Sequence, residues 1–390
     1  MLINGKRALA YTARIDEIRP IPDYDRVEHA RVGGWWIIVS KADNFKVGDI
    51  CVYFEIDSKM PETELFAFMA KRKYRVKTIK MCKVYSQGLI MPLSAFGFEE
   101  METGIDLTDK LGITYYVEED NIRKSSKIDP QMKYKVMAQR HQSLFRKPFI
   151  RWMMRREWGR RLLFVFFGRK RQVPTKFPSH FPYVKVTDEE RVENMPWILE
   201  DKEPWIKTTK IDGTSTTFIL ERKGRKFIEY VCSRNVRQLT PSQKNFHTDI
   251  EGNVYWMMAE KYKVFDFLKD FMNKNGLDYA ALQGETAGPS LQGNPHGFDE
   301  IQFFGFNLIR SDVGRINSIE AKDICAQYDI PWVPIVDEHY ILPDDFEEFK
   351  LSADGPCEAP GARGMREGYV YRSLDGQKSF KNVSRKYLLK

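Results

Sequence analysis

The sequence predicts an α+β protein in which a small β-barrel precedes an α/β domain. Short apolar runs separated by turns fill the first part of the chain, and helix-like and strand-like runs alternate from about residue 177. A strongly basic segment lies between these two parts. A chain of 390 residues is long enough for two or three domains with separate cores. We therefore expect a barrel at 1–125, a basic helical insertion or linker at 126–175 and a second domain at 176–390.

The composition is that of a soluble globular protein, with 42% apolar and 30% charged residues. The longest apolar run, Leu162–Phe167, is too short to span a membrane and has arginines on both sides. No apolar segment of a secretory signal follows Lys6 and Arg7. The cysteines are far apart and the histidines show no metal-ligand spacing, so neither disulfides nor structural zinc are expected. A reducing compartment, the cytoplasm or the nucleus, fits best.

The barrel is predicted from about five β-branched or aromatic runs within about 90 residues, and the OB-fold is the commonest five-stranded barrel. Turn-like residues at 22–25 and 46–49 separate some of these runs. Arg75 and Lys77 alternate along one run, near Tyr85 and Gln87, and are either part of a nucleic-acid surface or ordinary exposed residues. The expected strands are Ala8–Ile15, Trp35–Ser40, Ile50–Ile56, Tyr74–Met81 and Gly88–Leu93.

The basic segment Lys133–Arg171 contains 13 lysines and arginines against the single acid Glu157, a local charge of +12. Since the whole chain carries +8, the remainder is acidic at −4. Aromatic residues interleave with the arginines at rough helical spacing. This pattern suits RNA, through phosphate pairing and base stacking, and equally suits an interfacial amphipathic helix or a helical insertion packed between domains. Charge runs in general are most often solvated helices, so these interpretations stay open.

The second domain is predicted from alternating strands and helices. Its longest helical pattern is Val254–Asn273, with Gly276 placed to end it, and a later short helix is expected to be capped by Ser318. The expected strands are Trp205–Thr209, Thr216–Leu220, Phe227–Cys232, Tyr279–Gln283, Ile301–Ile309, Gly368–Arg372 and Ser379–Val383.

The most informative motif is Lys210-Ile211-Asp212-Gly213, a turn between two apolar runs. A lysine amine has an ordinary pKa near 10.4, so it is protonated at pH 7 and cannot act as a nucleophile. Nucleophilic attack by Lys210 at neutral pH would require burial and nearby cations to lower this pKa by roughly 3 units. Asp212 and Gly213 suit a tight turn that presents Lys210 at a pocket floor, with Gly213 leaving room for a nucleotide. A Lys-x-Asp-Gly occurs by chance in roughly one chain of this size in ten. Alone, the motif is more simply interpreted as a hairpin turn with an exposed lysine.

Five further elements follow the lysine turn in a fixed order and strengthen the functional interpretation. They offer a cation and hydrogen-bonding groups, a carboxylate at a strand end, an aromatic strand able to stack on a purine, a second carboxylate and a late cation. Each is common alone, but the combination in this order is not. The elements are Ser233-Arg234-Asn235, Gln283-Gly284-Glu285, Phe303 to Leu308, Glu367-Gly368-Tyr369-Val370 and Lys378-Ser379-Phe380-Lys381.

This order resembles the motifs of the covalent nucleotidyltransferase superfamily, which comprises ATP-dependent RNA ligases, DNA ligases and mRNA capping enzymes. Runs in the first half, including Pro20-Ile21-Pro22, Glu55 to Ser58 and Ser86 to Leu89, resemble RNA ligases with an N-terminal OB domain, typified by those of Deinococcus and Naegleria. Thr187 to Arg191 resembles that group's entry into the catalytic domain. The resemblance implies an OB-fold barrel followed by a nucleotidyltransferase domain with antiparallel sheets, and the barrel's N-terminal place favours RNA ligation.

The resemblance also implies roles for individual residues. The cofactors would be ATP and Mg²⁺ or Mn²⁺. The implied catalytic residues are Lys210, Glu285, Glu367 and Lys381, of which Glu285 and Glu367 would hold the metal, and the implied nucleotide-binding residues are Asp212, Gly213, Arg234, Phe306 and Lys378.

The implied activity joins RNA 3′-OH and 5′-phosphate ends through lysyl-AMP and RNA-adenylate, and a nicked duplex is one form that the substrate could take. The alternatives are a GTP-using capping-type enzyme and a non-catalytic OB-containing RNA-binding protein. The chain departs from the resemblance at Thr209, where many relatives have an acid, and at Ser379, where a lysine is frequent. The basic segment also lies outside the resemblance.

Overall fold

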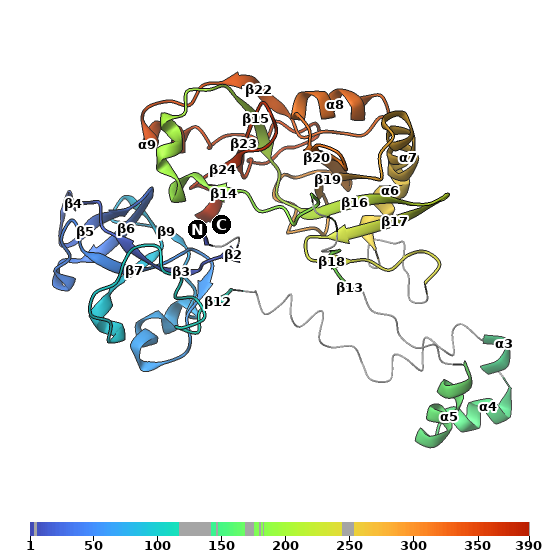
Figure 1. The fold of residues 1–390 in the computed structure, drawn as a ribbon. Coiled ribbons are helices and arrows are strands. Elements are labelled where there is room, and N and C mark those ends of the chain that lie inside the picture. Colours follow the sequence, from blue (N-terminus) through green and yellow to red (C-terminus); the bar gives the residue numbers. More distant parts are fainter. Residues whose placement is uncertain are drawn as a thin grey trace. The chain divides into compact units, whose positions relative to one another are not determined.

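The fold is that of a computed structural model, which describes residues 1–3, 6–116, 142–145, 147–167, 175–178, 181, 183–243 and 253–389 (Figure 1). The chain forms two compact units. The larger unit comprises Met1–Tyr116, Lys176–Gln238 and Val254–Lys390, and the smaller comprises Val117–Thr175 and Leu239–Asn253.

The first part of the larger unit is built from short antiparallel strands, as the sequence predicts. Two three-stranded sheets dominate it, ordered β11-β7-β3 and β4-β5-β6. Trp35 and Tyr53 are almost fully buried between them and anchor the first of two apolar clusters. The strands are β3 (Ala10–Arg14), β4 (Glu17–Ile21), β5 (Tyr24–Val32), β6 (Trp35–Ser40), β7 (Ile50–Phe54) and β11 (Leu89–Pro92).

Short pairs of strands and 3₁₀ helices complete this part. The pairs are β1 (Leu2–Ile3) with β2 (Lys6–Arg7), β8 (Ser58–Lys59) with β12 (Thr114–Tyr115), and β9 (Thr78–Met81) with β10 (Val84–Gln87); the 3₁₀ helices are η1 (Lys41–Asp43), η2 (Glu64–Arg72) and η3 (Leu93–Phe96).

The structure corrects the predicted strands at two places. The expected run Tyr74–Met81 is a strand only from Thr78, because Lys73 and Tyr74 adopt left-handed conformations with φ of 53° and 57°. The hairpin of β4 and β5 was not predicted, because charged residues interrupt its apolar pattern and only Ile21, Ala30 and Val32 are buried. The expected strand Trp35–Ser40 is confirmed.

The second part of the larger unit contains two sheets built mainly from antiparallel pairs, with β14 and β24 paired in parallel. The seven-stranded sheet is ordered β13 (Thr175–Lys176), β18 (Val236–Arg237), β17 (Lys226–Ser233), β16 (Thr214–Lys223), β19 (Tyr279–Ala287), β20 (Gln302–Arg310) and β21 (Gly314–Arg315). The five-stranded sheet is ordered β14 (Glu190–Arg191), β24 (Ser379–Val383), β23 (Gly368–Ser373), β15 (Trp205–Lys210) and β22 (Ile335–Tyr340).

Helices cover the seven-stranded sheet, with α7 against β16 and β19 and α8 against β20 (Figure 1). The predicted helix Val254–Asn273 is two helices, because Lys263 is left-handed with φ of 47° and breaks it. Gly276 ends the second helix with φ of 64°, as predicted. The helices are α6 (Val254–Lys261), α7 (Val264–Asn275), α8 (Ser318–Ala326) and α9 (Phe346–Leu351), and the 3₁₀ helices are η4 (Val192–Asn194), η5 (Pro196–Glu200) and η6 (Tyr387–Leu389).

The cap of α8 differs from the prediction. The residue that caps this helix is Asn317 and not Ser318, since the Asn317 side chain accepts hydrogen bonds from the backbone N–H groups of Ile319 and Glu320. Ser318 is buried as the first helical residue. Both residue types favour helix starts, so the sequence signal was misplaced by one position.

The smaller unit contains the helices α3 (Gln142–Phe145), α4 (Pro148–Met154) and α5 (Glu157–Phe167). Phe145, Met153 and Leu163 form its small core, whereas Phe149 and Trp158 are exposed. Some lysines and arginines of the basic segment Lys133–Arg171, including those at 133–140 and 169–171, lie outside the described residues. Over the described ranges, no helix has the length and apolar character needed to cross a membrane.

Candidate active site

The lysine turn connects the two sheets of the second part. Lys210 is the last residue of β15 in the five-stranded sheet, and β16 of the seven-stranded sheet begins at Thr214. A Cβ atom at Gly213 would lie 2.3 Å from the carbonyl oxygen of Thr286, so no larger residue fits without a backbone shift. The Lys210 side chain is therefore presented where the two sheets meet.

A cavity of about 510 Å³ lies at this junction and is lined mostly by polar residues. Eight residues singled out from the sequence line it: Lys210, Asp212, Gly213, Arg234, Glu285, Phe306, Glu367 and Lys381. The ninth, Lys378, does not; it is exposed in the hairpin between β23 and β24 and is not brought to the cavity.

Two carboxylates face the lysine from different strands. Glu367 directly precedes β23, and its Oε2 lies 2.6 Å from the Nζ of Lys210. Glu285 lies on β19 in the other sheet. Gly368 adjoins Glu367 with φ of 156°, and a Cβ there would lie 2.2 Å from the carbonyl oxygen of Asn382. The backbone at Glu367 therefore packs directly on β24.

These carboxylates reverse the expected shift of the Lys210 pKa. Burial lowers the pKa of this amine, but Glu367 and Glu285 raise it more, with a further contribution from Asp212, so the pKa is raised well above its ordinary value. The expectation that cations around Lys210 lower its pKa is wrong for this state of the site. The amine is protonated here, and it becomes a nucleophile only when the negative charge around it is neutralised or displaced.

Glu285 is destabilised as an anion in the same cluster. Burial raises the pKa of its carboxyl group, Lys210 lowers it, and Glu367 and Asp212 raise it further, to about 8. An additional positive charge near Glu285 and Glu367 would relieve this repulsion.

The oxygen donors at this position fit a divalent cation that also binds substrate phosphates. Within the described ranges, no group of three or more His, Cys, Asp or Glu side chains is arranged to hold a metal. Mg²⁺ characteristically uses one or two carboxylates together with waters and substrate phosphates. Glu285 and Glu367 supply such a carboxylate pair beside the cavity.

A second charged cluster, around Asp188, lines the same cavity. Asp188 pairs with Nζ of Lys381 at 3.1 Å and with Nη2 of Arg234 at 3.0 Å. Burial and the neighbouring Arg191 lower the pKa of Lys381 to about 8, with Lys210 acting in the same direction. Burial raises the pKa of Asp188, but Lys381 and Arg234 lower it below its ordinary value. This excess of cations suits an anionic ligand such as a phosphate group.

Phe306 forms an apolar part of the cavity wall. It is half-buried on β20, and Val333 and Val370 line the same cavity. The guanidinium carbon of Arg372 lies 5.6 Å from the centre of the Phe306 ring. This combination of an aromatic ring, aliphatic side chains and a buried cation could hold a purine.

Residues of the N-terminal part complete the cavity. Arg7, Asp57 and Tyr115 line it. Arg75, which the sequence suggested for a nucleic-acid surface, donates to Asp57 at 2.8 Å and lies over Tyr116. Lys77 is exposed, whereas Gln87 is fully buried and cannot belong to such a surface.

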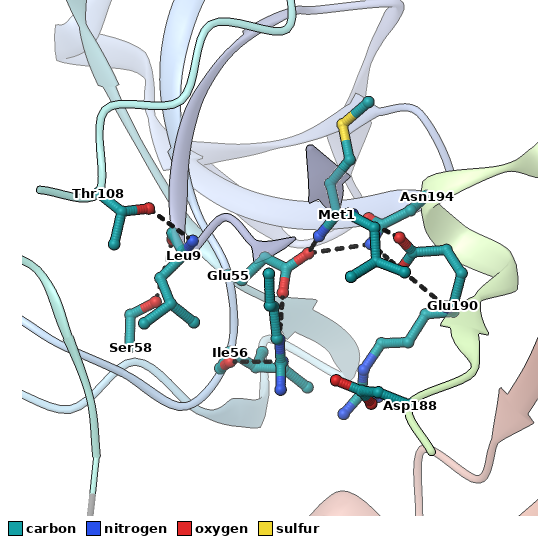
Figure 2. Close-up of polar contacts among 12 residues, drawn as sticks. Met1, Leu9, Glu55, Ile56, Ser58, Thr108, Asp188, Glu190 and Asn194 are labelled. Carbon is teal, nitrogen blue, oxygen red and sulfur yellow. Dashed lines mark hydrogen bonds and ion pairs between the residues drawn. The ribbon is translucent and has the colours of Figure 1, made fainter. Parts of the chain in front are cut away.

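Asn194 links the two parts of the larger unit (Figure 2). Its Nδ2 donates to Glu55 at 2.9 Å and to Glu190 at 2.7 Å. Its Oδ1 accepts from the Trp35 indole at 2.6 Å and from the Tyr11 hydroxyl at 3.3 Å. The amide of Asn194 thus joins Tyr11, Trp35 and Glu55 of the N-terminal part to Glu190.

Sequence reasoning missed several residues of the site. Asp188 and Arg191 lie in the run Thr187 to Arg191, whose likeness to ligases was noted but to which no role was given. Arg372 was missed because nothing in its strand distinguishes it, although it is almost fully buried and lines the cavity. These three become neighbours of Lys210 only through long-range packing.

Comparison with known proteins places these features in context. Residues 9–93 match a family model for an OB-fold domain, and residues 203–388 match the RNA ligase family model. No curated protein matches the chain.

Solved structures of Naegleria gruberi RNA ligase resemble the whole chain. An apo mutant is 28% identical with a TM-score of 0.73, and the match covers 98% of this chain and 97% of that one. The form with PPi is 27% identical, and a mutant with ATP and Mn is 28% identical; both have a TM-score of 0.73 and cover 98% of each chain.

Proposed function

Because the chain belongs to the RNA ligase family, with an OB-fold domain before its ligase domain, we propose that it is an ATP-dependent ligase that joins RNA 3′-OH and 5′-phosphate ends through Lys210. The observation that carries the proposal is the position of the Lys210 amine. It lies in a cavity between two sheets, 2.6 Å from Glu367, with Glu285 and Lys381 lining the same cavity.

In the first step, the Lys210 Nζ loses its proton and attacks the α-phosphorus of ATP. A phosphoramidate bond between Nζ and AMP forms, and pyrophosphate leaves. Phe306 would stack on the adenine, Gly213 and Asp212 would border the nucleotide, and Lys381 would contact the α-phosphate. Because the Lys381 side chain is only 14% exposed and has a neighbouring carboxylate in Asp188, it is held in place before the ligand arrives.

Glu285 and Glu367 would hold the divalent cation, Mg²⁺ or Mn²⁺. When bound, the cation supplies positive charge that offsets the charge of the phosphates and favours the neutral form of the lysine amine. Glu367 would then exchange its ion pair with Lys210 for a metal contact. The raised pKa of Glu285 supports this assignment, because it is caused first by burial, and a buried carboxylate that has lost its hydration gains from a bound cation.

In the second step, an oxygen of the RNA 5′-phosphate attacks the AMP phosphorus and Lys210 leaves, which gives RNA-adenylate. In the third step, the RNA 3′-OH attacks the 5′-phosphate and AMP leaves. Arg234 is exposed at the cavity rim and would contact the ribose or the RNA 5′-phosphate. Lys378 is exposed outside the cavity, so we assign it no role in nucleotide binding.

The RNA partner would extend beyond the cavity. The OB-fold domain would hold the 3′-OH strand, and the basic segment would add affinity for the RNA backbone that does not depend on sequence. A nicked duplex provides both ends in one molecule and is the form that we would test first. This activity suits the cytoplasm or the nucleus.

The proposal is tested by transfer of α-³²P label from ATP to the purified protein with Mg²⁺, read on a denaturing gel. Label on the wild type and none on Lys210→Ala is expected, followed by sealing of a nicked duplex with 3′-OH and 5′-phosphate ends. Label from GTP and not ATP would instead indicate a capping-type enzyme. No label from either nucleotide, on folded and unmodified protein, would indicate a non-catalytic RNA-binding protein.

A further inference from the structure

Two aromatic side chains hold Asp212, and none of the roles above uses them. The backbone N–H of Asp212 donates to Nε2 of His296 at 2.7 Å. The Tyr387 hydroxyl donates to Oδ2 of Asp212. His296 is fully buried, and its ring lies nearly parallel to that of Tyr387, at 18° with 6.4 Å between ring centres. Both contacts fall two residues from Lys210.

The hydrogen bonds of His296 define its proton position. Since Nε2 accepts from Asp212, it carries no hydrogen, and Nδ1 therefore carries one and donates to the carbonyl oxygen of Met365 at 3.0 Å. The imidazole is neutral and bridges two segments. One contains Lys210, and the other leads within two residues to Glu367.

The segment around His296 also packs at backbone distance on the chain before Glu367. The carbonyl oxygen of His296 accepts from the N–H groups of Arg363 at 2.8 Å and Gly364 at 2.9 Å. A Cβ atom at Gly364 would lie 2.2 Å from the carbonyl oxygen of Pro295. His296 is thus rigidly fixed and can transmit that rigidity to the lysine turn.

Tyr387 has independent anchors. Its backbone N–H donates to the Ser384 hydroxyl at 3.1 Å. Arg385, two residues earlier, donates to Gln87 at 3.2 Å, and Leu388 packs against the apolar cluster of the OB-fold domain around Trp35. The hydroxyl that holds Asp212 is therefore placed by contacts with the OB-fold domain.

We propose that His296 and Tyr387 are positioning residues that fix the Lys210–Gly213 turn for attack on the nucleotide. The inference rests on the proposed function. Lys210 has a long flexible side chain, so the direction of its Nζ depends on the backbone from which it projects. His296 fixes that backbone through the Asp212 N–H, and Tyr387 fixes the adjacent carboxylate. A misplacement of about 1 Å in such a site lowers a rate by about 100-fold.

The three chemical steps offer a readout that a general structural role would not give. Formation of lysyl-AMP requires the Lys210 amine as nucleophile. Joining of pre-adenylylated RNA to a 3′-OH end does not, because the amine takes no part in that bond change. Loss of positioning should therefore slow the first reaction much more than the second.

Three variants of His296 and Tyr387 each remove a different hydrogen bond. Tyr387→Phe keeps the ring and removes only the hydroxyl that reaches Asp212. His296→Asn can still donate to Met365 but leaves the Asp212 N–H without its acceptor. His296→Gln can present a carbonyl oxygen to Asp212 but loses the bond to Met365. Tyr230→Phe is the matched control, since it removes a hydroxyl that donates to Glu221 at 2.7 Å outside the cavity.

The experiment measures single-turnover lysyl-AMP formation at saturating ATP, joining of pre-adenylylated RNA, and thermal stability of each full-length variant. We expect lysyl-AMP formation to fall by about 10- to 100-fold in Tyr387→Phe and His296→Asn, and by less in His296→Gln. Joining of pre-adenylylated RNA should stay within about 3-fold of wild type, and Tyr230→Phe should match wild type in both reactions.

Wild-type rates of lysyl-AMP formation in Tyr387→Phe and His296→Asn would overturn the inference. So would an equal fall in both reactions, because that result would mean a general structural role. If the wild-type protein itself forms no lysyl-AMP, the proposed function fails and the inference fails with it. If the wild type forms lysyl-AMP and the variants match it, only the inference fails.

Discussion

At the scale of single residues, the site is an arrangement of charges that cannot all be satisfied without a ligand. Glu285, Glu367 and Asp212 are the acidic neighbours of Lys210, while Lys381 in the same cavity has Arg191 and Lys210 as cationic neighbours. The ion pair between Lys210 and Glu367 does not stabilise the Glu285 carboxylate enough to keep it ionised as usual, because the pKa of Glu285 stays strongly raised.

The raised pKa of Glu285 predicts a pH dependence of stability. Because its pKa is about 8 in the folded protein and near 4.5 ordinarily, the folded state binds this proton more tightly than the unfolded state. The resulting stabilisation is complete below about pH 4.5 and is lost as the pH rises through 8. Glu285→Gln removes this loss, so the free energy of unfolding of the variant should exceed that of wild type increasingly from pH 6 to 8, by up to a few kcal/mol.

Urea unfolding of both proteins at pH 6, 7 and 8, without nucleotide or divalent cation, measures this difference. Contributions from other titrating groups, including Lys381, are common to both proteins and cancel to first order. A difference between the two proteins that stays constant across this range would show that Glu285 does not titrate there.

At the scale of elements, the turn between β15 and β16 depends on the absence of a side chain at Gly213. In Gly213→Ala, the new Cβ would contact the Thr286 carbonyl, so the turn must move and lysyl-AMP formation should fall by about 100-fold. Gly224→Ala is a matched control in the β16–β17 turn. Its φ is 61° and its Cβ would enter open space, so it should lower stability by about 1 kcal/mol without lowering the rate.

Labelling with α-³²P ATP, compared at equal amounts of folded protein, distinguishes the two variants. Equal labelling of Gly213→Ala and wild type would mean that the turn tolerates a side chain and that its geometry is not critical.

Strands with regular apolar patterns were predictable from sequence, and features set by local backbone conformation were not. Trp35–Ser40 was predicted with its observed ends, because its residues are apolar and bounded by turn-forming residues. The break between α6 and α7 was missed, because it occurs at Lys263. This residue adopts a left-handed backbone conformation, which a lysine in a sequence does not predict. The strand at Tyr279 was predicted to end at Gln283, before Gly284, but it continues to Ala287.

The candidate site was partly predictable for a related reason. Motifs that combine several informative residues, such as Lys210 to Gly213, can be recognised from a single sequence. The structure brings the residues of this motif to one cavity. Lys378 was included because it is next to such a motif, but the hairpin turns it outward. His296 and Tyr387 were not predicted, since their partners lie 84 and 175 residues away in sequence.

At the scale of the whole larger unit, the OB-fold domain and the ligase domain share one cavity, and Asn194 joins them. Asn194→Ala should leave the buried Trp35 indole N–H without its acceptor, at a cost of about 1–3 kcal/mol, and should remove one donor from the buried Glu55, which keeps its contacts with Met1 and Arg7. It should also lower the rate of lysyl-AMP formation by about 10-fold, because Arg7 and Tyr115 reach the cavity from the OB-fold domain.

Asn317→Ala provides the comparison for that prediction. It removes the cap of α8, which costs about 1 kcal/mol, but it does not touch the domain junction. Urea unfolding and lysyl-AMP formation are measured for both variants. If Asn194→Ala adenylylates at the wild-type rate while losing stability, the docked OB-fold domain is not needed for the first step.

The ion pair between Lys210 and Glu367 also protects the protein from unwanted chemistry. Acylating metabolites, isocyanates and aldehydes react with neutral amines and spare ammonium groups. A lysine kept protonated by its own carboxylate partner is inert toward these reagents, although it lines an open cavity. In the proposed mechanism this amine becomes reactive only with the nucleotide and cation in place, so the protein without nucleotide would keep Lys210 unmodified.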